Sequence, residues 1–309
     1  MHTSKRPTGS ARLRETADSF RTTRRDVLRL AGAAGLAGSL SSFISAPALG
    51  QPVKKIRLAH SAPTAHGWQV WAVEFKKQIE AKTSGKIQVQ IFPNAQMGNE
   101  NQIAAAVRIG ELEMGEVGVG LMRWVPEMSI TDAPFLWKSR QQCANAIAGA
   151  FGDELRKRAK AKGFLLVGWT DLGFRCITNN KHPINSVKDM RGLKMRVPNS
   201  KAYIAMMEAT GASVVAVNLS ELYLALRQGV ADGQDTPPTV VESNKFYEVQ
   251  KFVSKTNHIL TTAYAIGNPK FFSTFASEEL KAFHASCHEA DNYLRHHTEQ
   301  GEKDAYQFL

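Results

Sequence analysis

Three short apolar strands alternate with two helical segments between Ile56 and Val119. Strands are predicted over 56–60, 86–92 and 114–119, because apolar residues dominate or alternate there. The segments 66–83 and 100–109 carry apolar residues at helical spacing, and Gly85 and Gly110 follow them as helix-ending residues. Short connections in the order strand, helix, strand are typical of parallel sheets with right-handed crossovers. The chain is therefore predicted to have an α/β fold.

The rest of the chain continues with the same kinds of element. Strands are predicted over 164–169 and 174–178, around a turn at 171–173, and over 193–198, 212–217 and 259–266. Helices are predicted over 200–210, 220–228 and 239–247, with Ser220 as a cap, and a long polar helix runs from Ser277 almost to Leu309. We expect the strand at 259–266 to return to the first sheet. Two lobes joined by more than one crossing, with a cleft between them, fit this order.

One arginine lies inside an apolar strand. In the segment 193–199 apolar and polar residues alternate around Arg196, and Pro198 ends the strand because it has no N–H to donate. Arg196 is therefore placed near the carboxyl end of a strand, where open α/β sheets bind ligands. Its planar guanidinium matches a carboxylate in two parallel hydrogen bonds. Arg175, in the segment 173–179, is placed similarly; for each arginine the alternative is a partly buried structural ion pair.

Composition and charge narrow the class of protein. Of the 309 residues, 43% are hydrophobic and 22% are charged, which is ordinary for a soluble globular protein. Residues 1–50 carry eight Lys and Arg against three Asp and Glu, so +5 of the net charge of +11 lies there and +6 in the remainder. The remaining charges are interspersed rather than gathered in a basic stripe, which argues against nucleic-acid binding. Cys143, Cys176 and Cys287 have no metal or redox spacing and are expected to be buried.

The amino-terminal residues have the pattern of an export signal. Arg24 and Arg25 form a twin-arginine pair, and an uncharged stretch of Ala, Gly, Leu and Ser follows over 30–49. Small residues near position 50 have the spacing that a signal peptidase recognises. We therefore predict a cleaved twin-arginine-type signal over 1–50 and a periplasmic mature protein. The alternative is an uncleaved membrane anchor.

The sequence offers no catalytic, cofactor-binding or metal-binding set. The nine histidines are scattered, without the spacing that metal sites use, and no G-x-S-x-G pattern occurs. The glycines of 115–120 are predicted on a strand and lack a following Lys-Ser/Thr, so they do not form a phosphate loop. His60 and His66 flank the end of the first strand and are placed to edge a cleft; the alternative is that they are solvated loop residues. Two well-placed arginines without catalytic partners favour a binding protein.

Several stretches, in order, resemble the solute-binding proteins of tripartite ATP-independent periplasmic (TRAP) transporters of the DctP type. They are 92–98 (FPNAQMG), 132–136 (DAPFL), 189–198 (DMRGLKMRVP), 220–234 (SELYLALRQGVADGQ) and 245–251 (KFYEVQK). The resemblance runs from about Lys54 to Leu309. It implies a two-lobed fold of the type II periplasmic-binding-protein kind, with mixed sheets flanked by helices, a ligand cleft between the lobes and a long C-terminal bracing helix.

The resemblance also implies domain boundaries. The first lobe is expected to comprise 51–173 and about 258–285. The second lobe, with the bracing helix, is expected to comprise 174–257 and about 286–309. Family members usually continue for a few dozen residues beyond the position that Asp304 matches. Either this sequence is truncated or its brace is shorter.

The resemblance places roles on individual residues. Arg196 matches the arginine that clamps the ligand carboxylate, and Arg175 matches a second, more variable contact. Asp235 and Thr236 stand where the family commonly has Glu-Asn, which replaces a ligand-contacting amide by a hydroxyl. From their positions near strand ends, Trp169 and Phe174 are candidates to cover an apolar part of the ligand, with a core role as the alternative. The predicted substrate-binding residues are Arg196, Arg175, Thr236, Asp235, Trp169, Phe174 and His60.

The predicted function is capture of a small organic carboxylate in a closing cleft between lobes, and its delivery to a TRAP permease for uptake driven by an ion gradient. The expected partners are the small acid and the membrane permease subunits, with no nucleic acid, and we expect a monomer. Two alternatives remain: a solute-binding module that serves a sensor kinase, and an exported enzyme. The second would need a catalytic set that the sequence does not show.

Overall fold

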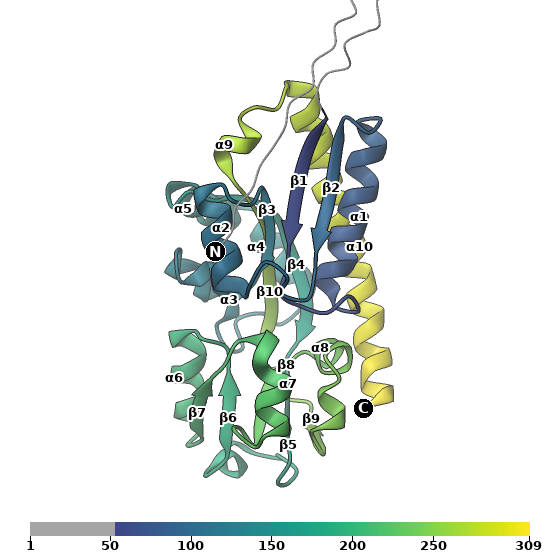
Figure 1. Cartoon of the computed structure of the whole chain (residues 1–309). Coiled ribbons are helices and arrows are strands. Elements are labelled where there is room, and N and C mark those ends of the chain that lie inside the picture. Colours follow the sequence, from purple (N-terminus) through teal and green to yellow (C-terminus); the bar gives the residue numbers. More distant parts are fainter. Residues whose placement is uncertain (1–52) are drawn as a thin grey trace, which may run out of the picture. The chain divides into compact units, whose positions relative to one another are not determined.

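The computed structural model describes residues 53–309 (Figure 1). The predicted export signal over 1–50 lies outside these residues. The described part contains two five-stranded sheets, each flanked by helices, so the predicted α/β fold is confirmed. We call the sheet that holds β1 and its helices the first lobe, and the sheet that holds β6 and its helices the second lobe. None of the helices in this part is long and apolar enough to cross a membrane.

The first lobe is built on a mixed sheet with the strand order β2-β1-β3-β10-β4. β1 pairs in parallel with β2 and β3, as the alternation of strands and helices predicts, whereas β10 is antiparallel to β3 and β4. The prediction that the strand near 259–266 returns to the first sheet is confirmed. The elements are β1 (Lys54–Ala59), α1 (Gly67–Lys82), β2 (Ile87–Phe92), α2 (Glu100–Ile109), β3 (Met114–Val117), α3 (Val119–Met122), the 3-10 helix η1 (Pro126–Asp132), α4 (Arg140–Ala148), α5 (Ala150–Ala161), β4 (Leu165–Phe174), β10 (Leu260–Gly267), α9 (Pro269–Phe272) and α10 (Ser277–Phe308).

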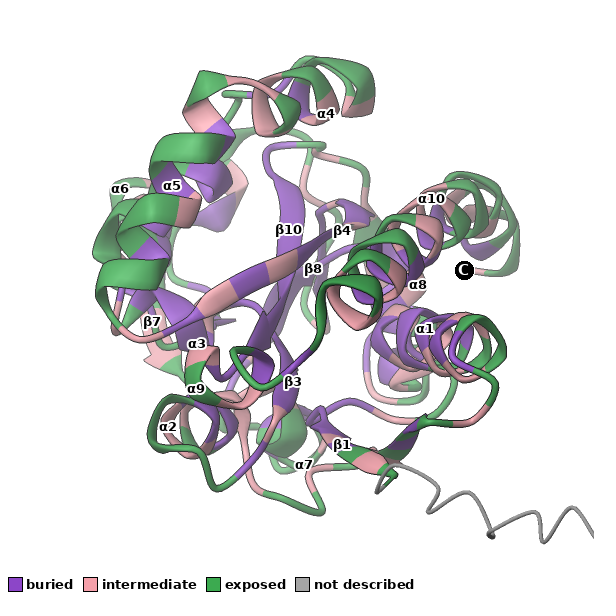
Figure 2. Ribbon diagram, turned by 90° about the horizontal axis from the view of Figure 1, so that it is seen from above, coloured by how far each residue is buried: buried purple, intermediate pink, exposed green. Residues whose placement is uncertain are grey.

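Buried apolar layers cover both faces of the first sheet (Figure 2). On one face Trp71 and Phe75 of α1 stack on each other at 5.1 Å, and Phe75 meets Phe283 of α10 edge to face. The other face packs on α2, α3 and α5. α2 begins and ends where the sequence predicts, because Asn99 forms a reciprocal capping box and Gly110 takes the left-handed conformation.

The second lobe has the strand order β7-β6-β8-β5-β9. β6 runs parallel to β7 and β8, and β5 is antiparallel to β8 and β9. One apolar cluster holds this sheet against α6 and another holds it against α7 and α8. The elements are β5 (Cys176–Asn179), the 3-10 helix η2 (Val187–Met190), β6 (Lys194–Val197), α6 (Lys201–Ala209), β7 (Ser213–Ala216), α7 (Leu219–Arg227), β8 (Gly233–Thr236), α8 (Pro238–Ser243), the 3-10 helix η3 (Phe246–Glu248) and β9 (Phe252–Ser254).

The turn predicted at 171–173 is wrong, because β4 continues through it. β4 pairs with β10 up to Phe174, and the register shift between Thr261 and Thr262 leaves Leu172 as the extra residue of a bulge. Gly173, with φ of +104°, absorbs the resulting bend. The glycine therefore marks a bulge in the strand that leads toward the second lobe, and the sequence pattern alone does not distinguish the two.

Helix α10 contacts both lobes, as a brace between them would. Its first half contributes Phe283 and Leu294 to the apolar layer of the first lobe, and its last turn places Tyr306 against the cluster of α7 and α8. Near the crossing, Arg140 forms ion pairs with Asp171 of β4 and Glu302 of α10. The predicted bracing helix is confirmed.

Two predicted helices differ from the observed ones at their ends. Asn218, rather than Ser220, is the N-cap of α7. The helix predicted over 239–247 is split, because Lys245 adopts the left-handed conformation with φ of +57° and a separate 3-10 helix follows. Neither change moves a residue that lines the cavity described below.

The three cysteines are buried and free, as predicted. Burial raises the pKa of Cys143 and of Cys176 to about 12, so both thiols are protonated at neutral pH. They act as small apolar residues.

A buried carboxyl group in the first lobe has no partner within residues 53–309. Neither side-chain oxygen of Glu116 on β3 makes a hydrogen bond there. Burial, and then the neighbouring Asp291 of α10, raise the pKa of Glu116 well above its usual range. Asp291 accepts hydrogen bonds from the Trp71 ring and the Trp169 backbone, yet burial raises its pKa to about 7. Folding therefore opposes the charged form of both groups.

We expect Glu116→Gln to stabilise the protein, and to do so more at pH 8 than at pH 5. The unfolded carboxyl ionises near its usual pKa, whereas the folded one holds its proton to a higher pH, so the wild type loses stability as pH rises above that usual value. An uncharged amide removes this loss, and a gain of about 1–3 kcal/mol at pH 8 corresponds to the cost of an uncompensated buried polar group. Urea unfolding at both pH values measures it. An equal difference at pH 5 and pH 8 would contradict the assignment.

Candidate ligand-binding site

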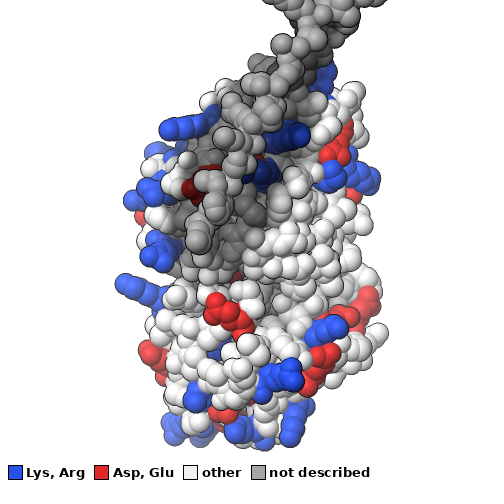
Figure 3. All heavy atoms as spheres, viewed as in Figure 1, with Lys and Arg blue, Asp and Glu red and all other residues white. Residues whose placement is uncertain are grey.

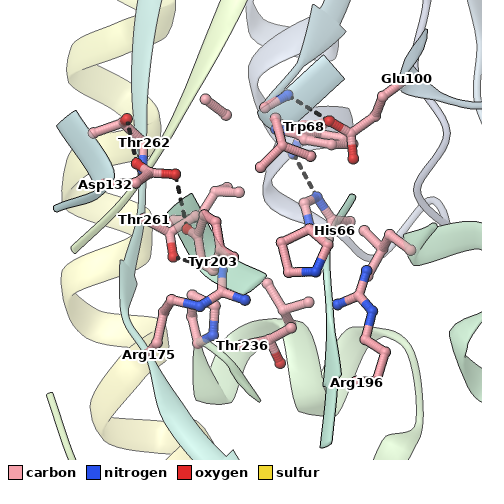
Figure 4. A pocket seen from close by; sticks show the side chains of 18 residues that line it. His66, Trp68, Glu100, Asp132, Arg175, Arg196, Tyr203, Thr236, Thr261 and Thr262 are labelled. Carbon is pink, nitrogen blue, oxygen red and sulfur yellow. Dashed lines mark hydrogen bonds between the residues drawn. The ribbon is translucent and has the colours of Figure 1, made fainter. Parts of the chain in front are cut away.

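A cavity of about 60 Å³ lies between the two lobes (Figure 4). By volume it has room for roughly four to six water molecules. Most of the lining is apolar or neutral, but two arginines from the second lobe and two acids from the first lobe face it. The polar lining residues are His66, Trp68, Glu100, Asp132, Arg175, Arg196, Tyr203, Thr236, Thr261 and Thr262.

Arg196 is a buried cation without an acidic partner. It sits on β6, one residue before the strand ends, and only 2% of its surface is exposed. Its Nε donates to the backbone oxygen of Val217 at 2.8 Å, which fixes the guanidinium, and none of the ion pairs among residues 53–309 includes it. Burial lowers its pKa to about 10, and the nearby Arg175 adds to this, against the raising effect of Asp235. The two Nη groups are free to bind an anion.

Arg175, in contrast, is neutralised by the protein. It lies between β4 and β5, and its Nε donates to the Asp235 carboxylate at 2.8 Å. A further Nη bonds to the backbone oxygen of Asp235, and the guanidinium lies 4.8 Å from the centre of the Tyr203 ring. Burial alone would lower the pKa of Arg175, but the charge of Asp235 outweighs it and the pKa is raised. Although burial opposes ionisation of Asp235, Arg175 lowers its pKa to about 2. The pair is a stable, net neutral unit.

Two neutral donors from the first lobe complete the other side of the cavity. His66 is the N-cap of α1, and its Nδ1 accepts the backbone N–H of Trp68 at 3.1 Å. The His66 Nε2 and the Trp68 Nε1 are buried and have no hydrogen-bond partner within residues 53–309. Figure 4 shows the His66 ring between Trp68 and the arginines.

Glu100 and Thr236 supply oxygen atoms. Glu100 begins α2, and one of its carboxylate oxygens accepts the backbone N–H groups of Gly118 at 2.7 Å and Gly120 at 3.3 Å. Its other oxygen makes no hydrogen bond to the described residues. Burial raises the pKa of Glu100, against the lowering effect of these N–H groups and of the two arginines. The hydroxyl of Thr236 is buried at the end of β8 and likewise has no partner within the described residues.

A hydrogen bond crosses the cavity from one lobe to the other. The hydroxyl of Tyr203 on α6 donates to the Asp132 carboxylate at 2.8 Å, and Thr262 on β10 donates to the same carboxylate at 3.0 Å. Burial raises the pKa of Asp132 to about 6, despite these bonds. Arg175 adds a second link, through Thr261 at 3.2 Å. These contacts fix the relative position of the lobes around the cavity.

The structure brings together some of the predicted site residues. Arg196, Arg175 and Thr236 line the cavity, and Asp235 lies directly behind Arg175. Trp169, Phe174 and His60 do not line it. Trp169 packs against Tyr264 in the first-lobe core, Phe174 joins the cluster around Trp137, and His60 donates to or accepts from Gln69 behind the His66 loop.

Several lining residues were not predicted. Glu100, Asp132 and Tyr203 come from three separate elements, and nothing in the sequence links them. Their position in stretches that resemble the family was the available signal for Glu100 and Asp132. His66 was a candidate to edge the cleft, and its place at the start of a helical pattern also indicates its role as N-cap.

Outside the cavity, Lys and Arg side chains occur on both lobes and are mixed with Asp and Glu (Figure 3). Within residues 53–309, no group of three or more His, Cys, Asp or Glu is arranged to hold a metal ion. The arginines of the cavity therefore provide the main feature that would recognise an anion.

Comparison with known proteins identifies the family. Residues 58–309 match the family described as bacterial extracellular solute-binding protein, family 7 (DctP). The chain is 34% identical to a solute-binding protein of Verminephrobacter eiseniae over 68% of this chain and 63% of that protein. It is 30% identical to the 2,3-diketo-L-gulonate-binding periplasmic protein YiaO of Escherichia coli over 85% of this chain and 78% of that protein.

A solved structure is similar over most of the described part. It is a TRAP periplasmic solute-binding protein from Polaromonas sp. JS666 bound to D-erythronate, with a TM-score of 0.80 and 29% identity over 82% of this chain and 84% of that chain. Its family consists of solute-binding transport proteins rather than enzymes. The chain therefore belongs to family 7 of the bacterial extracellular solute-binding proteins, the DctP family of periplasmic TRAP solute-binding proteins.

Proposed function

We propose that this protein captures a small hydroxylated monocarboxylic acid and delivers it to a TRAP permease. The observation that carries the proposal is the contrast between the two buried arginines. Arg175 is already paired with Asp235, whereas Arg196 has no acid beside it. A buried unpaired charge is costly, and a ligand carboxylate that forms two charge-assisted hydrogen bonds would offset this cost. One uncompensated cation favours a ligand with one carboxylate.

The other polar groups favour hydroxyls on that acid. The unbonded oxygen of Glu100 accepts hydrogen bonds only, so a second carboxylate placed there would meet like charge, whereas a hydroxyl would donate to it. Thr236 can donate or accept. The cavity volume of about 60 Å³ limits a ligand bound in this arrangement of the lobes to a compact molecule. Longer acids would require the lobes to separate further, by the hinge motion that such proteins use.

The names of similar proteins support this ligand class. The E. coli relative is named for 2,3-diketo-L-gulonate, and the Polaromonas protein was solved with D-erythronate. Both compounds are carboxylic acids with further oxygens along the carbon chain.

A thermal-shift screen of the purified protein against organic acids tests the proposal. A ligand at a hundred times its dissociation constant should stabilise the protein by about 2.7 kcal/mol and raise the melting temperature measurably. We expect hydroxylated monocarboxylates to raise it more than the corresponding dicarboxylates, such as succinate. The uncharged amides of the same acids serve as controls. A shift with dicarboxylates alone would contradict the proposed class, and no shift with any acid would contradict the function.

We further propose that residues 1–50 direct the chain to the periplasm by the twin-arginine route. The pair Arg24 and Arg25 followed by an uncharged stretch supports it. A reporter fused to residues 1–50 should reach the periplasm of a bacterium with an intact twin-arginine system, and replacement of both arginines by lysine should abolish this. Delivery to a permease is tested by uptake of the bound acid into vesicles that contain the permease, with and without this protein.

A further inference from the structure

One ring nitrogen of His66 is fixed by the backbone, and the other is left for a ligand. His66 is 1% exposed, and its Nδ1 caps α1 by accepting the Trp68 N–H. Because Nδ1 is an acceptor, the neutral ring carries its proton on Nε2. This Nε2–H lines the cavity and has no partner within residues 53–309. A buried donor left in this state is costly, so its placement beside the cavity suggests a partner in the ligand.

The ring is a neutral donor over the whole physiological range. Burial, and then the proximity of His60, lower the pKa of His66 to about 3. The other charged or titratable groups that line the same cavity are Glu100, Asp132, Arg175, Arg196 and Tyr203. His66 therefore recognises a ligand oxygen by geometry, without adding a charge.

The geometry of Arg196 determines which ligand oxygen remains for His66. The Nε of Arg196 is bound to Val217, so its two Nη groups can take the two oxygens of one carboxylate. His66 and Trp68 then face the next oxygen along the ligand. Building on the proposed function, we propose that His66 is a specificity residue whose Nε2–H binds the oxygen on the second carbon of a 2-hydroxy acid. Trp68 Nε1–H is the neighbouring donor, and Glu100 accepts a proton from a ligand hydroxyl.

Paired ligands test this assignment. Titration calorimetry is performed on the full chain with 2-hydroxy acids of three to six carbons and with their 2-deoxy counterparts, such as D-glycerate and 3-hydroxypropionate. We expect the 2-hydroxy acids to bind about 10- to 100-fold more tightly, because the 2-deoxy acids leave the buried donors unpaired. In His66→Ser this preference should fall to a few fold. Serine is a good N-cap, so the melting temperature without ligand should stay near that of the wild type.

A second variant and a pH series separate recognition from structure. His66→Asn retains a capping oxygen and an N–H donor, so it should recover part of the preference. The ratio of wild-type to His66→Ser affinity should not change between pH 5 and pH 8, since the neutral ring does not titrate there. The ratio also cancels the titration of Asp132, which both proteins share. A ratio that falls as pH rises through about 6.5 would mean that a charged imidazolium binds the ligand.

The outcomes distinguish this inference from the proposed function. If acids bind and depend on Arg196, but show no preference for a 2-hydroxyl, the assignment of His66 fails and the proposed function stands. If His66→Ser retains the full preference, the assignment fails as well. If the wild type binds no acid, both fail.

Discussion

Replacement of Arg196 by glutamine is expected to weaken binding of the acid by about 3–5 kcal/mol, a factor of several hundred or more. The variant leaves a carboxylate in a buried cavity without its cation, and Arg175 cannot replace it because Asp235 already holds that guanidinium. Arg196→Lys should fall between the two, since an ammonium keeps the charge but loses the two-pronged geometry. Titration calorimetry with the acid found in the screen measures all three proteins.

The same substitution is expected to stabilise the protein without ligand. Burial holds the pKa of Arg196 at about 10, below its ordinary value near 12.5, so folding opposes the charged form at every pH below about 10. Such a shift corresponds to roughly 3 kcal/mol that the glutamine variant would recover in part. The exposed Arg227 offers a control with the same change of charge, because Arg227→Gln should affect neither property. A variant of Arg196 that binds normally, or melts earlier without ligand, would contradict this role.

A gain in stability with a loss of binding is the signature of a group retained for function. The structure thus separates two arginines that the sequence presents as equivalent. Both lie at strand ends in similar segments, and their periodicity predicts burial for each. The difference is set by Asp235, which is 60 residues from Arg175 in sequence and meets it because β5 and β8 pair. Such a pairing depends on register, which local sequence patterns leave open.

The same limit explains the predicted residues that do not line the cavity. A period of two predicts the strand over Trp169 and Phe174 but does not indicate which face meets the cleft. The bulge at Leu172 further changes which side chains share a face. The Tyr203–Asp132 bond depends on the approach of two lobes, which no local pattern encodes. The order of the elements, the helix bounds and the position of Arg196 could be predicted because they rest on short-range patterns.

Replacement of Asp235 by asparagine is expected to lower the free energy of unfolding by about 3–5 kcal/mol, because it leaves Arg175 buried without a counter-charge. Asp235 is fully buried, and His258 at 3.3 Å is its other charged or polar side-chain neighbour in the ion pairs of residues 53–309. The amide would also turn an N–H group toward a guanidinium that can only donate. Urea unfolding followed by circular dichroism measures the difference. Glu208→Gln, on the exposed face of α6, is the matched control and should have little effect.

The effect of Asp235→Asn should depend on pH in a defined direction. Arg175 lowers the pKa of Asp235 to about 2, below the value near 3.8 that the unfolded chain has. The stability that the carboxylate contributes is therefore complete above about pH 4 and is lost as pH falls toward 2. The gap between wild type and variant should stay constant from pH 8 to about pH 4 and narrow below it. A constant gap down to pH 2 would mean that the variant acts through packing rather than through the charge on Arg175.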